Sequence, residues 1–278
     1  MHREPNEIAD AFKAFEAAGW EQRAATYALF AARITSRLTD RLLDAAAVGP
    51  GTRVLDIATG PGHLAARAAE RNARVVGIDL ADAMLEQARS RHAGIEFRRG
   101  DAESLPFVDA SFDAAVAGFV LLHLARPEQA VAEAVRVLAP GGRAAFTVWD
   151  EPIRCRFLGV LIDAVAEAGA TPPADLPAGP PLFRFADDAE FASLLSEAGL
   201  AGVSVEAVAF TEPIESADEL WNGLMCGTVR MSPLILGQTE AMQRRIRHSF
   251  ERLLDEYRSD GGFAVPVAVK LASGRKPG

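Results

Sequence analysis

The chain has 278 residues, of which 49% are hydrophobic and 24% charged, a composition typical of an ordinary globular protein. The formal net charge is -9 and the basic residues are scattered among acidic ones, which argues against a nucleic-acid partner. Cys155 and Cys226 lack CxxC spacing, so neither a disulfide framework nor a structural zinc site is indicated. The acid-bearing N-terminal segment is not typical of a secretory signal, and the longest apolar stretch, 114–125, is too short to span a bilayer. We therefore expect a cytoplasmic protein without a membrane partner.

The first half of the chain predicts helices followed by a regular alternation of strands and helices. Apolar residues recur at helical spacing up to about residue 48, as in Ile8, Phe12 and Phe15, and two or three helices are expected there. After the Gly49-Pro50-Gly51 break, this alternation is the signature of a doubly wound, mostly parallel α/β sheet. The predicted strands are 53–58, 73–80, 95–99, 112–119 and 143–149, and the predicted helices are 62–71, 81–91 and 127–138.

The second half is less regular but predicts the elements that complete such a sheet. These are a helix at 157–168, a proline-rich surface loop at 172–181, a helix at 189–198, a strand at 202–210, a helical block at 217–257 and a strand at 262–271. Pro266 predicts that the last strand lies at the edge of the sheet, where a missing N–H is tolerated. We expect a Rossmann-like sheet of seven strands with helices on both faces and a helical cap. The predicted regions are cap helices 1–48, a cofactor-binding core 49–150, its completion 151–214, a helical lid 215–260, and a final strand and tail 261–278.

The ends of the first two predicted strands indicate a nucleoside-bearing ligand. The loop from Asp56 to Gly62 contains two glycines and enters a helix, which lets the backbone approach a ligand and offers free N–H groups to an anion. Asp79 ends the next apolar strand, where one carboxylate can accept hydrogen bonds from both hydroxyls of a ribose. Gly60, Gly62 and Ala65 also satisfy the dinucleotide fingerprint, so the glycine spacing alone leaves the cofactor open.

Four segments together resemble the class I S-adenosylmethionine-dependent methyltransferases of the Rossmann-like type. Within that class they are most similar to methyltransferase type 11, the branch that includes the ubiquinone and menaquinone C-methyltransferases. The segments are the loop 56–62, Asp79, the block 100–107 that leads to Ser111-Phe112-Asp113, and Pro140-Gly141-Gly142 before a strand. The resemblance covers about residues 54–149 and implies S-adenosylmethionine as cofactor, while it says almost nothing about the methyl acceptor.

The resemblance also implies roles for individual residues. Asp56 and the glycine loop would hold the methionine end of the cofactor, Asp79 the ribose, and Asp101 with the backbone of Ala102 the adenine amino group. Gly118 would offer its carbonyl to the methionine ammonium. Structural roles compete, because Asp56 could cap the loop and Asp101 could be a turn residue. The complete expected set is Asp56, Ala58, Gly60, Gly62, Asp79, Leu80, Asp101, Ala102 and Gly118.

The acceptor side has weaker signals. Methyl transfer from a sulfonium is an in-line displacement that needs alignment and exclusion of water, and no metal is required. His123, just past the fourth strand, is a candidate general base, and a structural histidine bonded to a neighbouring loop is the competing interpretation. Trp20 and Tyr27 in the N-terminal helices, with Trp221 and Met225 in the helical block, are candidates for an acceptor pocket. Core packing explains the first two equally, and residues such as the last two fill ordinary cores more often. These candidates favour a small hydrophobic or aromatic acceptor.

Three other functions fit parts of this pattern. A cyclase or decarboxylase on the same scaffold would bind the cofactor without transferring methyl. A nicotinamide-dependent oxidoreductase is disfavoured by Asp56 and by the later matching blocks, and a non-catalytic regulatory module is disfavoured by a complete set of site residues. The acceptor, the methylated atom and the oligomeric state leave no signature in the sequence.

Overall fold

The computed structural model describes residues 5–27, 30–174 and 176–278. Its strands are β1 (Arg53–Ile57), β2 (Arg74–Asp79), β3 (Glu96–Arg99), β4 (Phe112–Gly118), β5 (Leu138–Trp149), β6 (Ala201–Ile214), β7 (Arg258–Ser259) and β8 (Gly262–Arg275). Its α-helices are α1 (Pro5–Tyr27), α2 (Ala31–Thr35), α3 (Thr39–Ala45), α4 (His63–Glu70), α5 (Asp82–Arg91), α6 (Pro127–Val137), α7 (Arg156–Glu167), α8 (Asp188–Glu197), α9 (Ala217–Gly227), α10 (Met231–Leu236) and α11 (Glu240–Leu254). Short 3-10 turns are η1 (Ser36–Leu38), η2 (Leu121–His123), η3 (Arg184–Ala186) and η4 (Asp255–Tyr257).

One sheet organises the molecule. Seven strands follow the order β3-β2-β1-β4-β5-β8-β6, and β7 pairs with β8 outside that order. The strands β1 to β5 are parallel, whereas β8 is antiparallel to both of its neighbours. The mostly parallel α/β sheet is confirmed, and the predicted count of seven strands is short by β7, a two-residue strand beside the helical block.

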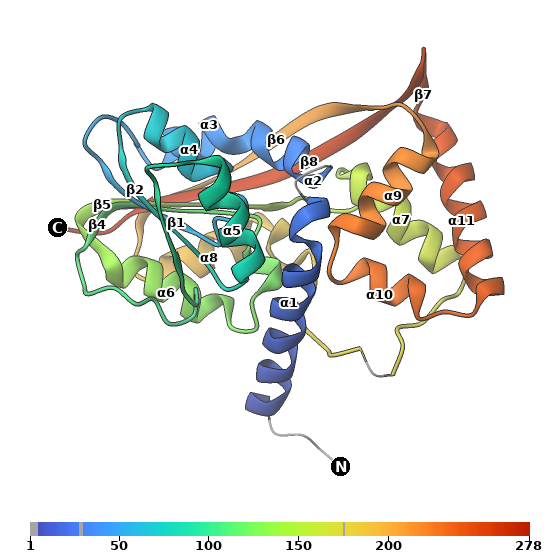
Figure 1. Cartoon of the computed structure of the whole chain (residues 1–278), viewed down its shortest axis with the longest axis horizontal. Coiled ribbons are helices and arrows are strands. Elements are labelled where there is room, and N and C mark those ends of the chain that lie inside the picture. Colours follow the sequence, from blue (N-terminus) through green and yellow to red (C-terminus); the bar gives the residue numbers. More distant parts are fainter. Residues whose placement is uncertain (1–4, 28–29, 175) are drawn as a thin grey trace.

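Helices cover both faces of the parallel part, as the nearly continuous apolar runs of β1 and β4 predict. Helices α3 and α4 lie on one face and α6 and α8 on the other (Figure 1). Fully buried Leu55 and Ala115 join the core on the α6 side, and Val54 and Ala114 join the core on the α3 side. Successive side chains of these strands therefore point into two different apolar cores, and neither face of the central sheet is exposed to solvent.

The predicted edge position of β8 is wrong, because β6 lies outside it. The register explains how Pro266 is accommodated in an internal strand. Val269 pairs with Trp149, the last residue of β5, and the carbonyl of Ala268 accepts from the N–H of Asp150. Residues two apart in a strand direct their backbone groups to the same side, so Pro266, like Ala268, faces the β5 side of the strand. Because β5 ends at Trp149, no carbonyl of β5 lies opposite Pro266 to need the N–H that proline lacks.

The long strands β6 and β8 carry the helical block at the end of the sheet. Helices α9, α10 and α11 gather there with α7 (Figure 1). Buried Phe157, Leu224, Phe250 and Val265 belong to one apolar cluster that also includes Phe30 beside α2. Helix α1 packs against α5 on one side and α9 on the other, so it links the parallel sheet to the helical block. Within the described residues, no helix has the length and hydropathy to cross a membrane.

Candidate functional site

A cavity of about 230 Å³ opens at the carboxyl ends of β1, β2 and β4. Its walls come from the loops after these strands, from α1, and from the segment between α9 and α10. In a doubly wound sheet the ligand crevice lies outside the carboxyl ends of the strands, where the strand order reverses, and here that point lies between β1 and β4. The topology of the sheet thus places the cavity where the sequence predicts a cofactor.

The carboxyl end of β1 carries a buried acid. Asp56 is only 1% exposed and accepts a 2.6 Å hydrogen bond from the hydroxyl of Thr59 and another from the backbone N–H of Ala65. Burial raises the pKa of Asp56 to about 7, since these hydrogen bonds offset only part of the desolvation and the charge of Asp79 adds to it. A cation in the cavity would favour the ionised form of this carboxyl group.

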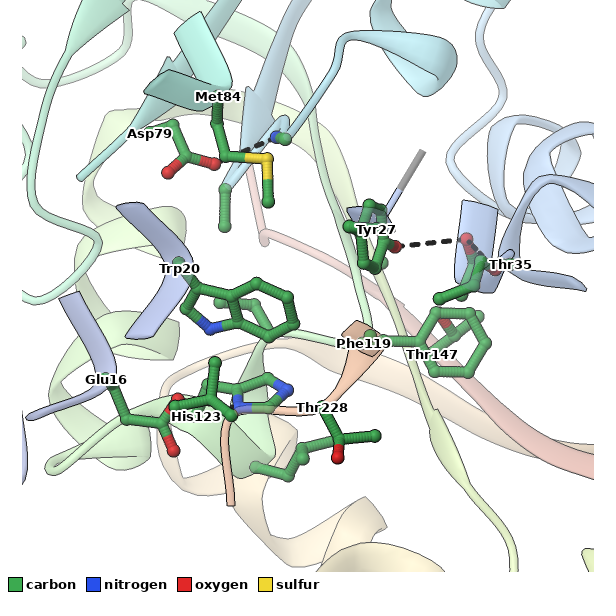
Figure 2. A pocket seen from close by; sticks show the side chains of 18 of the residues that line it. Glu16, Trp20, Tyr27, Thr35, Asp79, Met84, Phe119, His123, Thr147 and Thr228 are labelled. Atoms are coloured by element: carbon green, nitrogen blue, oxygen red, sulfur yellow. Dashed lines mark hydrogen bonds and ion pairs between the residues drawn. The ribbon is translucent and has the colours of Figure 1, made fainter. Parts of the chain in front are cut away.

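Asp79 connects the loops after β1 and β2. One oxygen accepts from the N–H of Gly60 at 2.8 Å and the other from the N–H of Ala81 at 2.9 Å. Burial raises the pKa of Asp79 to about 6. A carboxylate has about four acceptor positions, and the backbone N–H groups of Gly60, Ala81 and Leu80 do not occupy all of them. Figure 2 shows Asp79 beside Met84 at one end of the cavity, where further donors from a ligand can reach it.

The segment after β3 is tied to α1 by charge. Lys13 forms ion pairs with Asp101 and, at 3.0 Å, with Glu103. Glu103 is 2% exposed and also accepts from the N–H of Arg126 at 2.9 Å, which makes it a structural anchor. Asp101 and Ala102 line the cavity, as does Lys13, which the sequence patterns did not single out. Helix α1 therefore closes the cavity at the position predicted for adenine.

Most of the residues predicted for the site lie around this one cavity. The predicted residues that line the cavity are Asp56, Ala58, Gly60, Asp79, Leu80, Asp101, Ala102, Gly118, Trp20, Tyr27 and His123.

Gly62 is an exception, being absent from the described lining of the cavity. Its φ is +84°, and a Cβ built on it would lie 2.9 Å from the side chains of both His92 and Phe97. Tight packing of the loop against α5 and β3 explains this glycine, and its contact with the cofactor stays a prediction.

Trp221 and Met225, which the sequence predicts for an acceptor pocket, are likewise not among the described residues that line the cavity. Trp221 faces α11, with its ring 5.2 Å from that of Phe250 and under the guanidinium of Arg247. Met225 packs against the same apolar cluster. The residues of α9 that line the cavity are Gly223, Leu224 and Gly227. Helix α9 therefore directs the side chains of Trp221 and Met225 into the packing of the helical block.

The part of the cavity near the helical block has aromatic walls. The rings of Phe119 and Trp149 lie 4.3 Å apart, and Trp149 contacts Phe157 at 5.7 Å. Tyr27 shares a 3.1 Å hydrogen bond with the hydroxyl of Thr35, and burial raises the pKa of its phenol. These five side chains form what we call the aromatic chamber, whose walls suit an apolar molecule.

His123 lies where the aromatic chamber meets the loop after β4. Its Nδ1 is 3.0 Å from an oxygen of Glu16 on α1, and the ring of Trp20 meets it edge-on at 4.9 Å. Figure 2 shows His123 below Trp20, between Glu16 and Thr228. Glu16 is 4% exposed, and sequence reasoning missed it, although its position four residues after Phe12 puts an acid on the apolar face of the helix. With Nδ1 engaged by Glu16, Nε2 is the nitrogen that can meet a ligand.

Comparisons with known proteins agree with this geometry. A family model described as "Methyltransferase domain" matches residues 55–146. Those residues form a methyltransferase domain of that family. The demethylmenaquinone methyltransferase of Renibacterium salmoninarum is 38% identical over 118 residues, which are 42% of this chain and 50% of that protein. The chain spans about half the length of the curated relatives it matches.

Solved structures show that the fold of the methyltransferase domain extends over most of the chain. The YcgJ protein of Bacillus subtilis has a TM-score of 0.58 at 22% identity, covering 87% of this chain and 99% of that one. The [4+2]-cyclase SpnF has a TM-score of 0.53 at 24% identity, covering 87% and 82%. At these identities the likeness concerns the fold.

Proposed function

We propose that the protein transfers a methyl group from S-adenosylmethionine to a small acceptor with an apolar body. The observation that carries the proposal is that one cavity joins the polar loops after β1, β2 and β3 to the aromatic chamber. A donor and an acceptor can therefore lie next to each other in a site that α1 and the segment between α9 and α10 shield from water. The match of residues 55–146 to the methyltransferase family supports this assignment.

The polar half of the cavity fits the groups that the cofactor presents. Asp56 and Asp79 are buried acids with raised pKa values, and neither forms an ion pair with a described residue. A ligand with an ammonium group and two neighbouring hydroxyls would supply the missing partners. We assign the methionine end to Asp56, Ala58, Gly60 and Gly118, the ribose to Asp79 and Leu80, and the adenine to Asp101 and Ala102. The cofactor, when bound, supplies an electrophilic methyl group.

We assign to His123 the proton that the acceptor loses. Glu16 accepts the Nδ1–H of the ring, and this leaves the Nε2 lone pair for the acceptor. Trp20 restricts the ring from its edge. The buried carboxylate also stabilises the positive charge that the ring gains when it takes the proton. In this proposal His123 acts as a base and Glu16 positions it.

Mass analysis of products tests the proposed transfer. The protein is incubated with S-adenosylmethionine and small phenols, acids and amines, and each acceptor is examined for replacement of one hydrogen by methyl, with release of S-adenosylhomocysteine. SpnF, a cyclase, has the same fold, so a rearranged acceptor formed without S-adenosylhomocysteine would favour cyclisation over transfer. Stabilisation by NADH but not by S-adenosylhomocysteine would contradict the proposal altogether.

A further inference from the structure

Arg230 is the one arginine among the described residues that line the cavity. It directly precedes α10 and is partly buried. Its Nη1 donates to the carbonyl of Leu122 at 3.2 Å, and its guanidinium lies 5.2 Å from the ring centroid of Phe12. A guanidinium has five N–H donors, so most of its hydrogen-bonding capacity remains after this contact.

No carboxylate in the described part of the chain forms an ion pair with Arg230. Lys13, the other cation with a long side chain in the cavity wall, is paired twice. Glu16 is the acid whose charge reaches Arg230, and it is hydrogen-bonded to His123. Arg230 therefore presents a positive charge to a largely apolar space without a matching negative charge.

Comparison with another partly desolvated arginine shows how unusual this is. Burial lowers the pKa of Arg230, and only the more distant charge of Glu16 opposes it. Burial acts in the same direction on Arg156, but hydrogen bonds to Asp163 at 2.7 Å and to Tyr257 more than compensate, and the pKa of Arg156 is raised. An arginine kept in a desolvated place without a carboxylate is costly unless something else supplies the anion.

Arg23 repeats the pattern across the joint between α1 and α10. Its Nη2 donates to the hydroxyl of Ser232 at 3.2 Å, and its buried Nε has no hydrogen-bond partner in the described structure. Burial lowers its pKa as well. Arg23 and Arg230, neither of which forms an ion pair with a carboxylate of the described residues, thus both lie at the junction between α1 and α10, in a chain whose net charge is -9. The positive charge at this junction is opposite in sign to the net charge of the whole protein.

We propose that Arg230 binds an anionic group of the acceptor, so that the substrate is an organic acid with an apolar body. This inference rests on the proposed function and specifies its substrate class. A carboxylate matches the planar fork of a guanidinium and can accept two parallel hydrogen bonds from it. The contact of Arg230 with Leu122 places the bound anion next to His123, while the aromatic chamber receives the apolar part.

Matched pairs of acids and amides test the inference. Octanoate is compared with octanamide, and benzoate with benzamide, by calorimetry on protein saturated with S-adenosylhomocysteine at constant ionic strength. The acids should bind about 10- to 100-fold more tightly than the amides, as expected for hydrogen bonds between charged groups. Arg230→Gln should bring the acid to the affinity of the amide and leave the amide unchanged. Arg230→Lys should retain part of the preference.

Arg244→Gln is the matched control, because it removes the same charge from an exposed position on α11 and should keep the preference. Equal affinity for acid and amide in the wild type, including weak binding of both, would overturn the inference, as would an equal loss in Arg244→Gln. Should Arg230→Gln fail to fold, the intermediate affinity of Arg230→Lys carries the test. The S-adenosylhomocysteine titration of the same samples reports separately on the proposed function. If S-adenosylhomocysteine does not bind, the acids and amides are titrated against ligand-free protein.

Discussion

The two halves of the cavity are built in different ways. In the cofactor half, the polar groups lie at or just after the carboxyl ends of β1, β2 and β3, and hydrogen bonds such as that from Gly60 to Asp79 join neighbouring loops, with Lys13 of α1 as the one distant contact described above. In the acceptor half, contacts join distant segments: Glu16 meets His123 across 107 residues, and Arg23 meets Ser232 across 209. Cofactor recognition therefore depends on local motifs, whereas acceptor recognition depends on how α1 and the helical block pack over the sheet.

The largest effect is expected in the acceptor half. His123→Ala should lower turnover by about 10² to 10⁴, the usual scale for loss of a general base, with nearly unchanged affinity for S-adenosylhomocysteine. Raising the pH should restore part of the rate, because an acceptor ionised by solvent no longer needs the base. Steady-state kinetics with the acceptor identified by the product assay measures both effects.

Two results would separate this role from a structural one. Glu16→Gln, which removes the charge beside Nδ1 but keeps the shape, should give a smaller loss of turnover than His123→Ala. A lower melting temperature of His123→Ala with nearly normal turnover would instead indicate that the histidine only holds α1 in place.

The next effect belongs to the cofactor half. Asp79→Ala should weaken S-adenosylhomocysteine binding by about 1.5–3 kcal/mol, the scale for losing hydrogen bonds to a charged group. Calorimetry measures the affinity. Asp113→Ala is a control, because Asp113 pairs with Arg53 at the opposite end of β4 and is outside the cavity wall. Unchanged affinity in a folded Asp79 variant would remove this residue from the site.

These two halves also differ in how much the sequence could predict. Asp79 ends β2 and Gly60 follows β1, strands that their apolar runs identify, and the parallel topology then brings the two strand ends together. Trp221 is on a correctly predicted helix, but the side chain packs against α11, and the periodicity of α9 does not show where α11 lies. Glu16 and Arg230 acquire their significance from partners on other elements, and no local pattern specifies such partners.

The same contrast applies within the predicted sheet. The order of the parallel strands follows from short βα units, whereas Pro266 suggested an edge strand because the sequence does not show that β8 pairs with β5 and β6, nor in which register. Gly62 belongs to a correctly recognised loop, and its role still depended on the distant side chains of Phe97 and His92. Local conformation was predictable, and the contacts that decide a residue's role were not.

A smaller effect is expected where α9 approaches the N-terminal helices. A Cβ on Gly223 would lie 2.1 Å from the ring of Phe30, so Gly223→Ala forces this ring to move. Overpacking costs about 1–3 kcal/mol, and the higher helix propensity of alanine returns about 1 kcal/mol. Thermal denaturation should show a net loss of stability, with little change in S-adenosylhomocysteine affinity.

Gly227 in the same helix offers a matched control. A Cβ there would lie 3.5 Å from that of Ala31, an ordinary contact, so Gly227→Ala should be neutral or stabilising. Equal destabilisation by both variants would show that the approach of Gly223 to Phe30 is not what limits the packing of α9.

The smallest expected effect is a proton linked to cofactor binding. Burial raises the pKa of Asp56 from its ordinary value of 3.8 to about 7 in the ligand-free protein. The folded state therefore binds more protons than the unfolded state between these values, and the free energy of unfolding falls as the pH rises from about 4 to about 7. At pH 7 about half of the Asp56 side chains are protonated.

An ammonium group beside Asp56 lowers this pKa, so cofactor binding at pH 7 should release about half a proton, at a cost of about 0.4 kcal/mol in affinity. The number of protons follows from the enthalpy of S-adenosylhomocysteine binding measured in two buffers with different ionisation enthalpies. Asp56→Asn cannot ionise, so its binding enthalpy should depend little on the buffer. If the wild-type enthalpy is also independent of the buffer, the methionine end of the cofactor does not lie beside Asp56, and the acid is then a buried support of the loop through its bonds to Thr59 and Ala65.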